Sequence, residues 1–463
     1  MRVVLADLKG IGGLVTKDTV AGGYGSRLVP FSKVSRVVHY LKRRYINLPS
    51  VQMAYLAAIC DREGHQVAFT RDGLLEGDVA LVLSSLVDYR HETAWADQMR
   101  SRGVRVGFVG LAASKMPHLF ADHADFVIRG EPEEAVLRLA RGEELAGLCD
   151  SAPIMDLDTL PFPRWDLLRV NGQRRSRVAV RPNGGGFPLL SSRGCPEFCT
   201  YCPHRILADH RVRSVGNIVD ELELLARTYR RPYVIFRDPL FTESRDRVLA
   251  FCDEIQARGL EVRFDVETRL DRLDVALLDK AHAAGLRAIS YGVESVSPQA
   301  LKRVGRRPIP EAHHREVIAH CRKLGIVTAA FYVIGFPADD WQSVAATIDF
   351  AIAMDSTFAQ FKVLTPYPGT PLFTQVEAQI YESDWEKFDG FTPTFTHPNL
   401  TADELRFLLG AAYTRFYMRP SYLANLLKIQ NTRVREWVTR MDRRTSARYS
   451  RIEIEKMSRS VTC

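Results

Sequence analysis

Short apolar runs rich in β-branched residues alternate with helix-length amphipathic segments, and this alternation occurs in two separate blocks of the chain. In the first block the expected strands are Arg2–Ala6, Gln66–Thr70, Val79–Ser84, Arg105–Val109 and Asp125–Arg129. In the second block they are Leu189–Ser192, Tyr233–Phe236, Glu261–Glu267, Ala288–Gly292, Thr328–Ile334 and Gln360–Leu364. Strand–helix alternation favours parallel sheets whose faces are covered by helices. We therefore expect an α/β protein.

The length of 463 residues exceeds what one hydrophobic core usually serves, so we expect more than one domain. Residues 1–155 are expected to form a doubly wound, Rossmann-like domain. A Pro- and Gly-rich linker, 156–188, follows it. Residues 189–390 contain six β/α units, which is too few for a closed eight-stranded barrel and indicates a partial one. Residues 391–463 carry helical patterns and no strand pattern.

The formal net charge of +8 comes largely from one segment, because residues 430–463 contain nine Lys or Arg and four acidic residues. Such a segment could bind nucleic acid or a membrane surface, but neither a heptad pattern nor an interleaved stripe of aromatic residues accompanies it, and we expect neither partner. No apolar run approaches the ~18 residues of a membrane span, and the first residues do not resemble a signal peptide. We expect a cytoplasmic protein.

Three of the eight cysteines lie close together in the segment Cys195-Pro-Glu-Phe-Cys199-Thr-Tyr-Cys202, directly after an expected strand. Thiolates favour iron–sulfur clusters, zinc or Cu(I). A structural zinc site needs four ligands, and His204 is the nearest fourth residue in the sequence. An iron–sulfur cluster held by three thiolates would instead leave one iron open to a ligand. The C-x3-C-x2-C spacing directly after a strand, with an aromatic residue before the last cysteine, favours the cluster over a zinc site completed by His204.

The C-x3-C-x2-C spacing, with the aromatic Tyr201 before the last cysteine, resembles the radical S-adenosylmethionine superfamily. The resemblance implies that Cys195, Cys199 and Cys202 bind a [4Fe–4S] cluster that cleaves S-adenosylmethionine to a 5′-deoxyadenosyl radical. Later strand ends also resemble family motifs, and they supply further expected contacts to S-adenosylmethionine. These are Asp238 for the amino group, Arg269 for the carboxylate, Glu294 and Ser295 for the ribose, and Gly335 and Pro337, with Tyr201, beside the adenine.

Residues 1–165 resemble the cobalamin-binding domain that precedes the barrel in one subgroup of this superfamily. The resemblance rests on the segment that begins at Leu48-Pro-Ser-Val-Gln-Met, on Gly130-Glu-Pro-Glu133 and on Leu160-Pro-Phe-Pro-Arg-Trp165. The Asp-x-His-x-x-Gly motif that ligates cobalt is absent, as is usual in that subgroup. Leu111 follows Gly110 where many members have a second glycine, and its side chain could obstruct the nucleotide tail. The sequence therefore leaves cobalamin binding open. The alternative is that residues 1–165 are a structural relic of a cobalamin-binding domain.

Two reactions are compatible with these resemblances. The first is diol dehydration, since the chain resembles the diol dehydratase of aminoglycoside (apramycin) biosynthesis that acts on paromamine. Hydrogen abstraction from a carbinol carbon would lead to loss of water and a deoxy-keto product, with a ketone reductase acting downstream. Asp238, Asp265 and Glu267 could meet the ammonium groups of such an amino sugar. The second is cobalamin-dependent C-methylation. Either requires a low-potential electron donor such as a flavodoxin or ferredoxin, and the general acid and base are not assignable.

Overall fold

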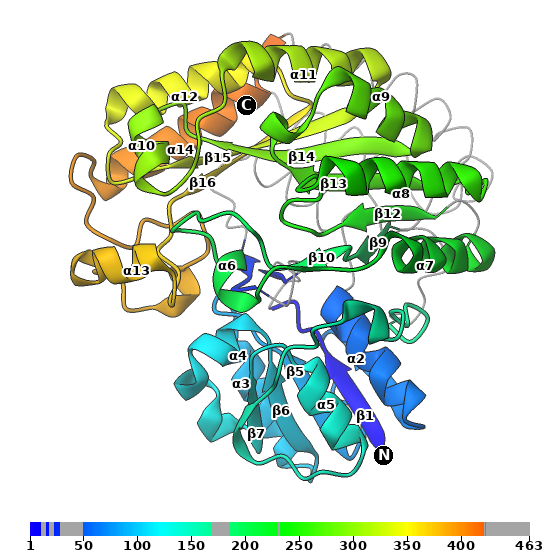
Figure 1. The fold of residues 1–463 in the computed structure, drawn as a ribbon. Coiled ribbons are helices and arrows are strands. Elements are labelled where there is room, and N and C mark those ends of the chain that lie inside the picture. Colours follow the sequence, from blue (N-terminus) through cyan, green and yellow to red (C-terminus); the bar gives the residue numbers. More distant parts are fainter. Residues whose placement is uncertain are drawn as a thin grey trace, which may run out of the picture. The chain divides into compact units, whose positions relative to one another are not determined.

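The computed structural model describes residues 1–10, 15–17, 23–27, 50–168, 186–229, 232–420 and 422. The chain packs as two compact units, Met1–Tyr413 and Thr414–Cys463. The first unit contains two six-stranded sheets that are entirely parallel, one from each of the two blocks expected from the sequence (Figure 1). The α/β fold class with parallel sheets is thus confirmed.

The first sheet has the strand order β4-β1-β5-β6-β7-β8. Its strands are β1 Arg2–Ala6, β4 Gln66–Thr70, β5 Val79–Leu83, β6 Arg105–Val109, β7 Phe126–Arg129 and β8 Gly147–Asp150. The helices that connect them include α2 Val51–Arg62, α3 Tyr89–Arg100, α4 Leu111–Lys115 and α5 Glu133–Ala140. The order reverses at β1, which pairs with β4 on one side and β5 on the other, so the sheet is doubly wound.

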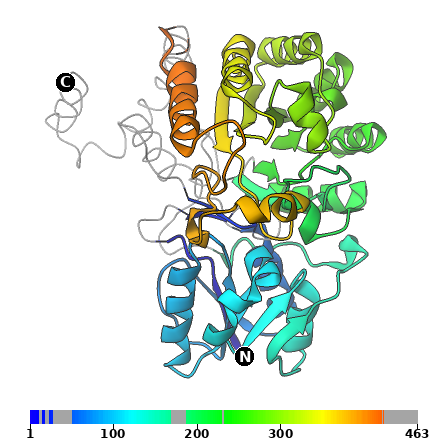
Figure 2. The ribbon, with the colours of Figure 1, turned by 90° about the vertical axis from the view of Figure 1, so that its left-hand side faces the viewer.

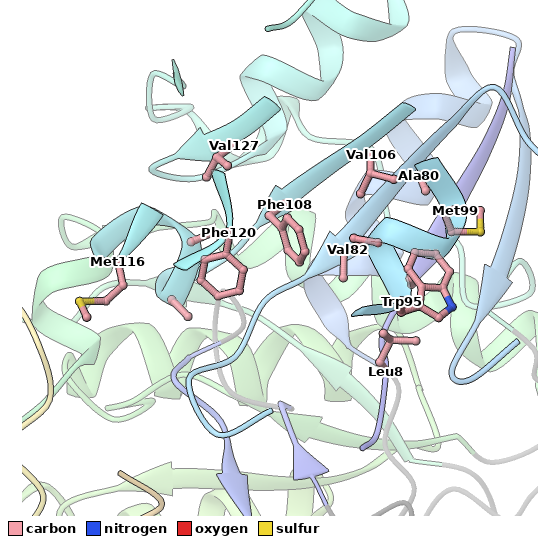
Figure 3. Close-up of a cluster of buried hydrophobic side chains, with 14 of the residues drawn as sticks. Leu8, Ala80, Val82, Trp95, Met99, Val106, Phe108, Met116, Phe120 and Val127 are labelled. Atoms are coloured by element: carbon pink, nitrogen blue, oxygen red, sulfur yellow. The ribbon is translucent and has the colours of Figure 1, made fainter. Parts of the chain in front are cut away.

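A buried aromatic and aliphatic cluster fills one face of this sheet (Figure 3). Phe108 of β6 packs against Phe120 with ring centroids 4.8 Å apart. Trp95 and Met99 of α3 belong to the same cluster, and both are almost fully buried. Burial of side chains of this size contributes roughly 1.5–3 kcal/mol each, so this core is a principal source of stability for the first sheet.

The second sheet has the strand order β16-β15-β14-β13-β12-β9, which follows the chain without reversal. Its strands are β9 Gly186–Leu189, β12 Tyr233–Phe236, β13 Arg263–Thr268, β14 Leu286–Glu294, β15 Val327–Ile334 and β16 Phe358–Val363. Helices on its outer face include α7 Val215–Thr228, α8 Arg245–Ala257, α9 Val275–Ala284, α11 Glu311–Leu324 and α12 Trp341–Met354 (Figures 1 and 2). This is the expected open array of six β/α units.

The start of the second sheet differs from the prediction. The expected strand Leu189–Ser192 is replaced by β9, which ends at Leu189, and by the two-residue strand β10, Ser192–Arg193. The ladder ends because the Ser191 N–H donates to the Asp238 carboxylate, at 3.0 and 3.1 Å, instead of to a neighbouring strand. β10 then pairs antiparallel with β11, Arg211–Val212, and the two form the base of a hairpin that contains the cysteine segment.

Helix α14, Ala402–Tyr417, agrees with the helical character expected after residue 390. The basic segment 430–463 and most of the expected linker, 169–185, lie outside the described residues. Within the described part of the chain, no helix is both long and apolar enough to cross a membrane. The domain boundaries taken from the sequence stay a prediction.

Candidate active site

The three clustered cysteines lie in the loop of the β10–β11 hairpin, at the carboxyl end of β9. Gly194 begins the loop with φ +69°, and a Cβ there would lie 2.5 Å from the Ala208 carbonyl oxygen, so only glycine fits. The Thr200 N–H donates to the Val304 carbonyl at 3.0 Å, and the Thr200 carbonyl accepts from the Leu372 N–H at 3.1 Å. The loop is therefore fixed to the segments that follow α10 (Pro298–Arg303) and β16.

The three thiols lie in a largely buried environment that raises the pKa of each. Burial, with smaller contributions from the neighbouring thiols of Cys199 and Cys195, raises the pKa of Cys202 to about 12. Burial also raises the pKa of Cys199, while Arg306 opposes that shift. Among the residues that the structure describes, no three His, Cys, Asp or Glu side chains converge on a point that could hold one metal ion.

Arg306 is a site residue that the sequence analysis missed. Its guanidinium lies 3.9 Å from the Cys199 Sγ, 3.5 Å from the Glu294 carboxylate, and donates to the Gly292 carbonyl at 2.5 Å. Burial raises the pKa of Glu294, and the nearby Arg306 guanidinium and Tyr201 hydroxyl oppose that shift. Glu294 has φ +66° at an irregularity in β14, a strained backbone conformation that tends to occur at functional sites. The sequence alone offers no signal that distinguishes Arg306, which lies at the site, from the neighbouring exposed Arg307.

The structure brings together the residues expected beside the adenine. Tyr201 packs edge-on against Phe336, with ring centroids 5.6 Å apart, and Phe336 stands between Gly335 and Pro337. Gly335 has φ +84°, and its N–H and that of Phe336 donate to the Asp339 carboxylate at 3.0 and 2.9 Å. This turn after β15 is thereby rigid. Burial raises the pKa of Asp339 to about 6, although both N–H groups lower it.

Arg269 lies at the end of β13 and is almost fully buried. Its guanidinium forms a fork with Asp271, with N–O distances of 2.9 and 2.8 Å, and donates to the Arg307 carbonyl at 3.2 Å. Its Nη1 atom is buried and has no hydrogen-bond partner among the described residues, although Glu197 lies 3.8 Å away. A cleft of about 390 Å³ adjoins it, lined by Pro196, Glu197, Phe198, Arg269, Asp271, Arg272 and Arg307. Arg269 could thus donate to a carboxylate.

Asp238 and Ser295 are both buried in contacts within the chain. The Asp238 carboxylate accepts from the Ser191 hydroxyl at 2.8 Å and the Ser192 hydroxyl at 2.5 Å, besides the Ser191 N–H. Ser295 accepts from the Ser297 N–H at 3.1 Å, just before α10. Asp238 therefore holds the entrance to the cysteine hairpin in this structure. The S-adenosylmethionine contacts expected of both residues stay predictions.

Two carboxylates that were considered for an amino-sugar substrate lie on the face of the second sheet opposite α8. The residues Phe236 and Phe264 pack on Phe251 of α8, both at 5.5 Å, and their neighbours in the strands face the other way. Glu267 on this second face pairs with Arg237. Asp265, on the same face, accepts a hydrogen bond from the Tyr233 hydroxyl. Asp238 is not part of this group.

The carboxyl edge of the first sheet, where doubly wound sheets bind ligands, is occupied by the chain itself. Lys17 and Glu92 form a fully buried ion pair of 2.5 Å, and the Lys17 ammonium also donates to the Leu83 carbonyl at 2.9 Å. The Ser85 N–H and hydroxyl both donate to Glu92, at 2.8 and 2.6 Å. Leu111, after Gly110, is 1% exposed and belongs to the core.

A second contact of the same N-terminal segment reaches the loop after β16. Tyr24 stacks on Tyr367 with ring centroids 5.2 Å apart and planes 6° apart, and its hydroxyl donates to the Pro368 carbonyl at 2.5 Å. The Tyr24 carbonyl also accepts from the Leu86 N–H at 2.8 Å. The segment around Tyr24 therefore connects the edge of the first sheet to the second block.

Comparison with known proteins shows which proteins this chain resembles. Residues 189–351 match the model of the radical SAM superfamily. An uncharacterized methyltransferase of Pyrococcus horikoshii is 28% identical over 417 residues, which cover 81% of this chain and 89% of the relative. The anaerobic magnesium-protoporphyrin IX monomethyl ester cyclase of Cereibacter sphaeroides is 28% identical over 321 residues, which cover 64% of this chain and 52% of the cyclase.

A solved structure shares the fold over most of the chain. The cobalamin-dependent S-adenosylmethionine radical enzyme OxsB, with aqua-cobalamin and S-adenosylmethionine bound, has a TM-score of 0.62 at 14% identity, covering 93% of this chain and 71% of OxsB. The matched segment 189–351 contains the cysteine hairpin and the strand ends of β12 to β15. Residues 189–351 are therefore similar to the radical SAM superfamily, and the fold over most of the chain is that of cobalamin-dependent members of it.

Proposed function

We propose that this chain reductively cleaves S-adenosylmethionine and uses the 5′-deoxyadenosyl radical to remove a hydrogen atom from a carbon of a small polar substrate. The observation that carries the proposal is the polar group at the thiols, in which Arg306 lies beside both Cys199 and Glu294. The donor set of three soft thiolates fits a [4Fe–4S] cluster with one open iron. When bound, that cluster supplies the electron that breaks the C5′–S bond, which leaves methionine and the radical.

The residues of the chain would orient S-adenosylmethionine around that open iron. Arg269 has a buried Nη1 atom available to the methionine carboxylate. Tyr201 and the Gly335–Pro337 turn form one wall for the adenine, and Glu294 lies near enough to Cys199, through Arg306, to meet the ribose. Most of these side chains are buried, so the walls exclude water, which would otherwise quench a primary radical.

The cysteine loop also offers a face to an electron donor. Phe198 is 65% exposed, and Arg205 stacks on its ring at 4.5 Å. Arg272 and Arg307, both exposed, line the adjoining cleft. A basic face around the cluster loop suits an acidic low-potential protein such as a flavodoxin or ferredoxin, because charge complementarity speeds association.

For the fate of the substrate radical, the comparisons favour methyl transfer over dehydration. The Pyrococcus relative is named as a methyltransferase, and OxsB is cobalamin-dependent. The described residues do not fit a cobalamin whose nucleotide tail enters the edge of the first sheet, because Lys17, Glu92 and Ser85 satisfy one another there. Methyl transfer through cobalamin therefore requires this segment to leave the edge, and we derive no step through cobalamin.

Diol dehydration of an amino sugar is the second candidate, and the filled edge is the observation that favours it. In that reaction the radical removes hydrogen from a carbinol carbon, the hydroxyl proton is lost, and the neighbouring hydroxyl leaves as water. One electron and one proton then complete the ketone. Asp265 and Glu267 lie on the sheet face where ammonium groups of such a substrate would be recognised.

Anaerobic reconstitution with iron and sulfide, followed by addition of dithionite and S-adenosylmethionine, tests the proposal. The wild-type chain should form 5′-deoxyadenosine, and the variant Cys199→Ala should lose both the cluster absorption and that product. Unchanged product formation by Cys199→Ala would refute the proposal. Cobalamin retained through anaerobic purification, together with S-adenosylhomocysteine during turnover, would select methyl transfer. Turnover without either would select dehydration.

A further inference from the structure

The base of the cysteine hairpin places two arginines opposite each other. In the register of β10 and β11, Arg193 pairs with Arg211. Both are nearly buried, at 4% and 8% exposure. Like charges directly opposite on neighbouring strands repel each other, and burial strengthens that repulsion. The hairpin therefore depends on negative groups supplied from elsewhere.

Those negative groups come from the first block of the chain. Arg193 donates to the Glu133 carboxylate at 2.7 Å and lies 3.3 Å from the Glu131 carboxylate. Glu131 also forms an ion pair with Arg211, so this one carboxylate bridges the two arginines. The arginine side of the network is completed by Tyr55 of α2, over whose ring the Arg193 guanidinium lies at 5.3 Å. Both glutamates are buried, at 4% and 1% exposure.

The segment that carries these glutamates is held rigidly on its own sheet. Gly130 has φ +94°, and a Cβ there would lie 2.8 Å from the Ser151 carbonyl oxygen. The Gly130 N–H donates to the Ser114 hydroxyl at 3.0 Å. The Ser151 hydroxyl donates to the Glu131 carbonyl and accepts from the Ala135 N–H at 3.1 Å. Because this segment is held rigidly on the first sheet, its glutamates hold the hairpin arginines in a fixed position relative to that sheet.

We propose that Glu131 and Glu133 are positioning residues, through which the N-terminal domain fixes the base of the cysteine hairpin and so holds the three thiols in place for the cluster. Cys195 follows Arg193 by two residues, so a displacement of Arg193 shifts the first thiol directly. The Gly130-Glu-Pro-Glu133 segment, which from the sequence resembled part of a cobalamin-binding domain, thereby has a role that needs no cobalamin. The inference takes the identity of the cluster from the proposed function, whereas the contacts themselves do not depend on it.

The test uses the full-length variant Glu131→Gln/Glu133→Gln, with Glu134→Gln as the matched control. Glu134 is the next residue of the same helix, but it pairs with Arg138 at the surface, with 28% of its side chain exposed. The first readout is amide hydrogen exchange of the metal-free protein. We expect faster exchange in residues 192–212 of the double variant and unchanged exchange in β1 and β5.

The second readout is the release of iron from the reconstituted protein to a chelator. Because groups that orient metal ligands typically contribute 10–100-fold to metal affinity, we expect release to be about tenfold faster in the double variant than in Glu134→Gln. The inference is overturned if both variants release iron at the same rate and protect residues 192–212 equally. It is also overturned if exchange rises throughout the first sheet, since that result would indicate general destabilisation. A chain that bound no cluster would refute the proposed function and leave the exchange result to decide the positioning role.

Discussion

Replacing Glu92 by glutamine should destabilise the chain strongly, because it leaves the Lys17 ammonium charged and buried. Both side chains are 0% exposed, and the pair is the shortest contact that either charged group makes. Glutamine keeps the size and one acceptor oxygen, so one of the two hydrogen bonds from Ser85, which go to different carboxylate oxygens, is lost together with the charge. The Leu83 carbonyl, at 2.9 Å, would remain as a polar contact of Lys17.

The expected magnitude follows from the burial of the pair. Removing one member of a buried ion pair costs roughly 3–5 kcal/mol. At about 2 °C per kcal/mol, the value for larger domains, the loss corresponds to a decrease in Tm of roughly 6–10 °C. The double variant Lys17→Met/Glu92→Gln removes both charges, and replacement of a buried pair by uncharged groups is often close to neutral. It should therefore recover most of the loss.

The assay is urea-induced and thermal unfolding of the metal-free protein, followed by far-ultraviolet circular dichroism. Glu134→Gln is the control, since it breaks a surface pair of the type that contributes at most about 1 kcal/mol. The reasoning is refuted if Glu92→Gln is as stable as this control, or if the double variant is no more stable than Glu92→Gln. Either outcome would mean that Lys17 does not close the edge of the first sheet in solution, and the edge would then be open to a ligand.

Three further predictions concern the second block. Arg306→Gln should lower iron retention and 5′-deoxyadenosine formation by roughly 10–100-fold, measured as iron per chain and as product after dithionite reduction, and equal values would contradict its place at Cys199. Arg205→Glu/Arg307→Glu should slow 5′-deoxyadenosine formation supported by reduced flavodoxin but not by dithionite. Lys323→Glu, a surface change on α11, should affect neither assay, and equal loss in both assays would place the arginines at S-adenosylmethionine instead. The third prediction concerns Asp339, whose pKa is about 6 in the folded chain and 3.8 ordinarily. The folded state therefore binds the proton of this carboxyl group more tightly than the unfolded state does. The contribution of Asp339 to the stability of the fold should fall as pH rises from about 4 to 6. The unfolding free energy of Asp339→Asn minus that of the wild type should rise by up to about 3 kcal/mol over that range, and a flat difference would contradict the shifted pKa.

The sequence predicted the elements whose cause is local. Strands such as Tyr233–Phe236 and Arg2–Ala6 are short apolar runs rich in β-branched or aromatic residues. The structure contains both strands with the predicted bounds. The strand β8 was missed because Gly147–Asp150 has no apolar run, and it joins the sheet through backbone pairing with β7. The two-residue strands β10 and β11 were missed for a similar reason, since they are too short to carry a pattern.

Candidate site residues divide in the same way. The cysteine spacing is local and highly specific, so the sequence was enough to place three thiols in one loop. Arg306 reaches Cys199 only because the segment after α10 packs on that loop, where a Cβ at Gly305 would lie 2.6 Å from the Phe198 carbonyl oxygen. For Asp238 the structure adds contacts that the sequence did not indicate, because its buried carboxylate accepts hydrogen bonds from Ser191 and Ser192, while its contact with S-adenosylmethionine stays a prediction. Contacts between distant segments decide both cases, and periodicity carries no information about them.

The first block of the chain, which the sequence predicts to be a separate domain, pairs its buried charges with other groups of the chain at two places. At one, Lys17 and Glu92 neutralise each other at the edge where a doubly wound sheet would hold a ligand. At the other, Glu131 and Glu133 neutralise the arginines beneath the cysteine loop. If the domain served only to hold cobalamin, loss of cobalamin would relax the need for both glutamates. Because these carboxylates instead offset the repulsion between two buried arginines, the domain has a reason to persist whichever fate the substrate radical has.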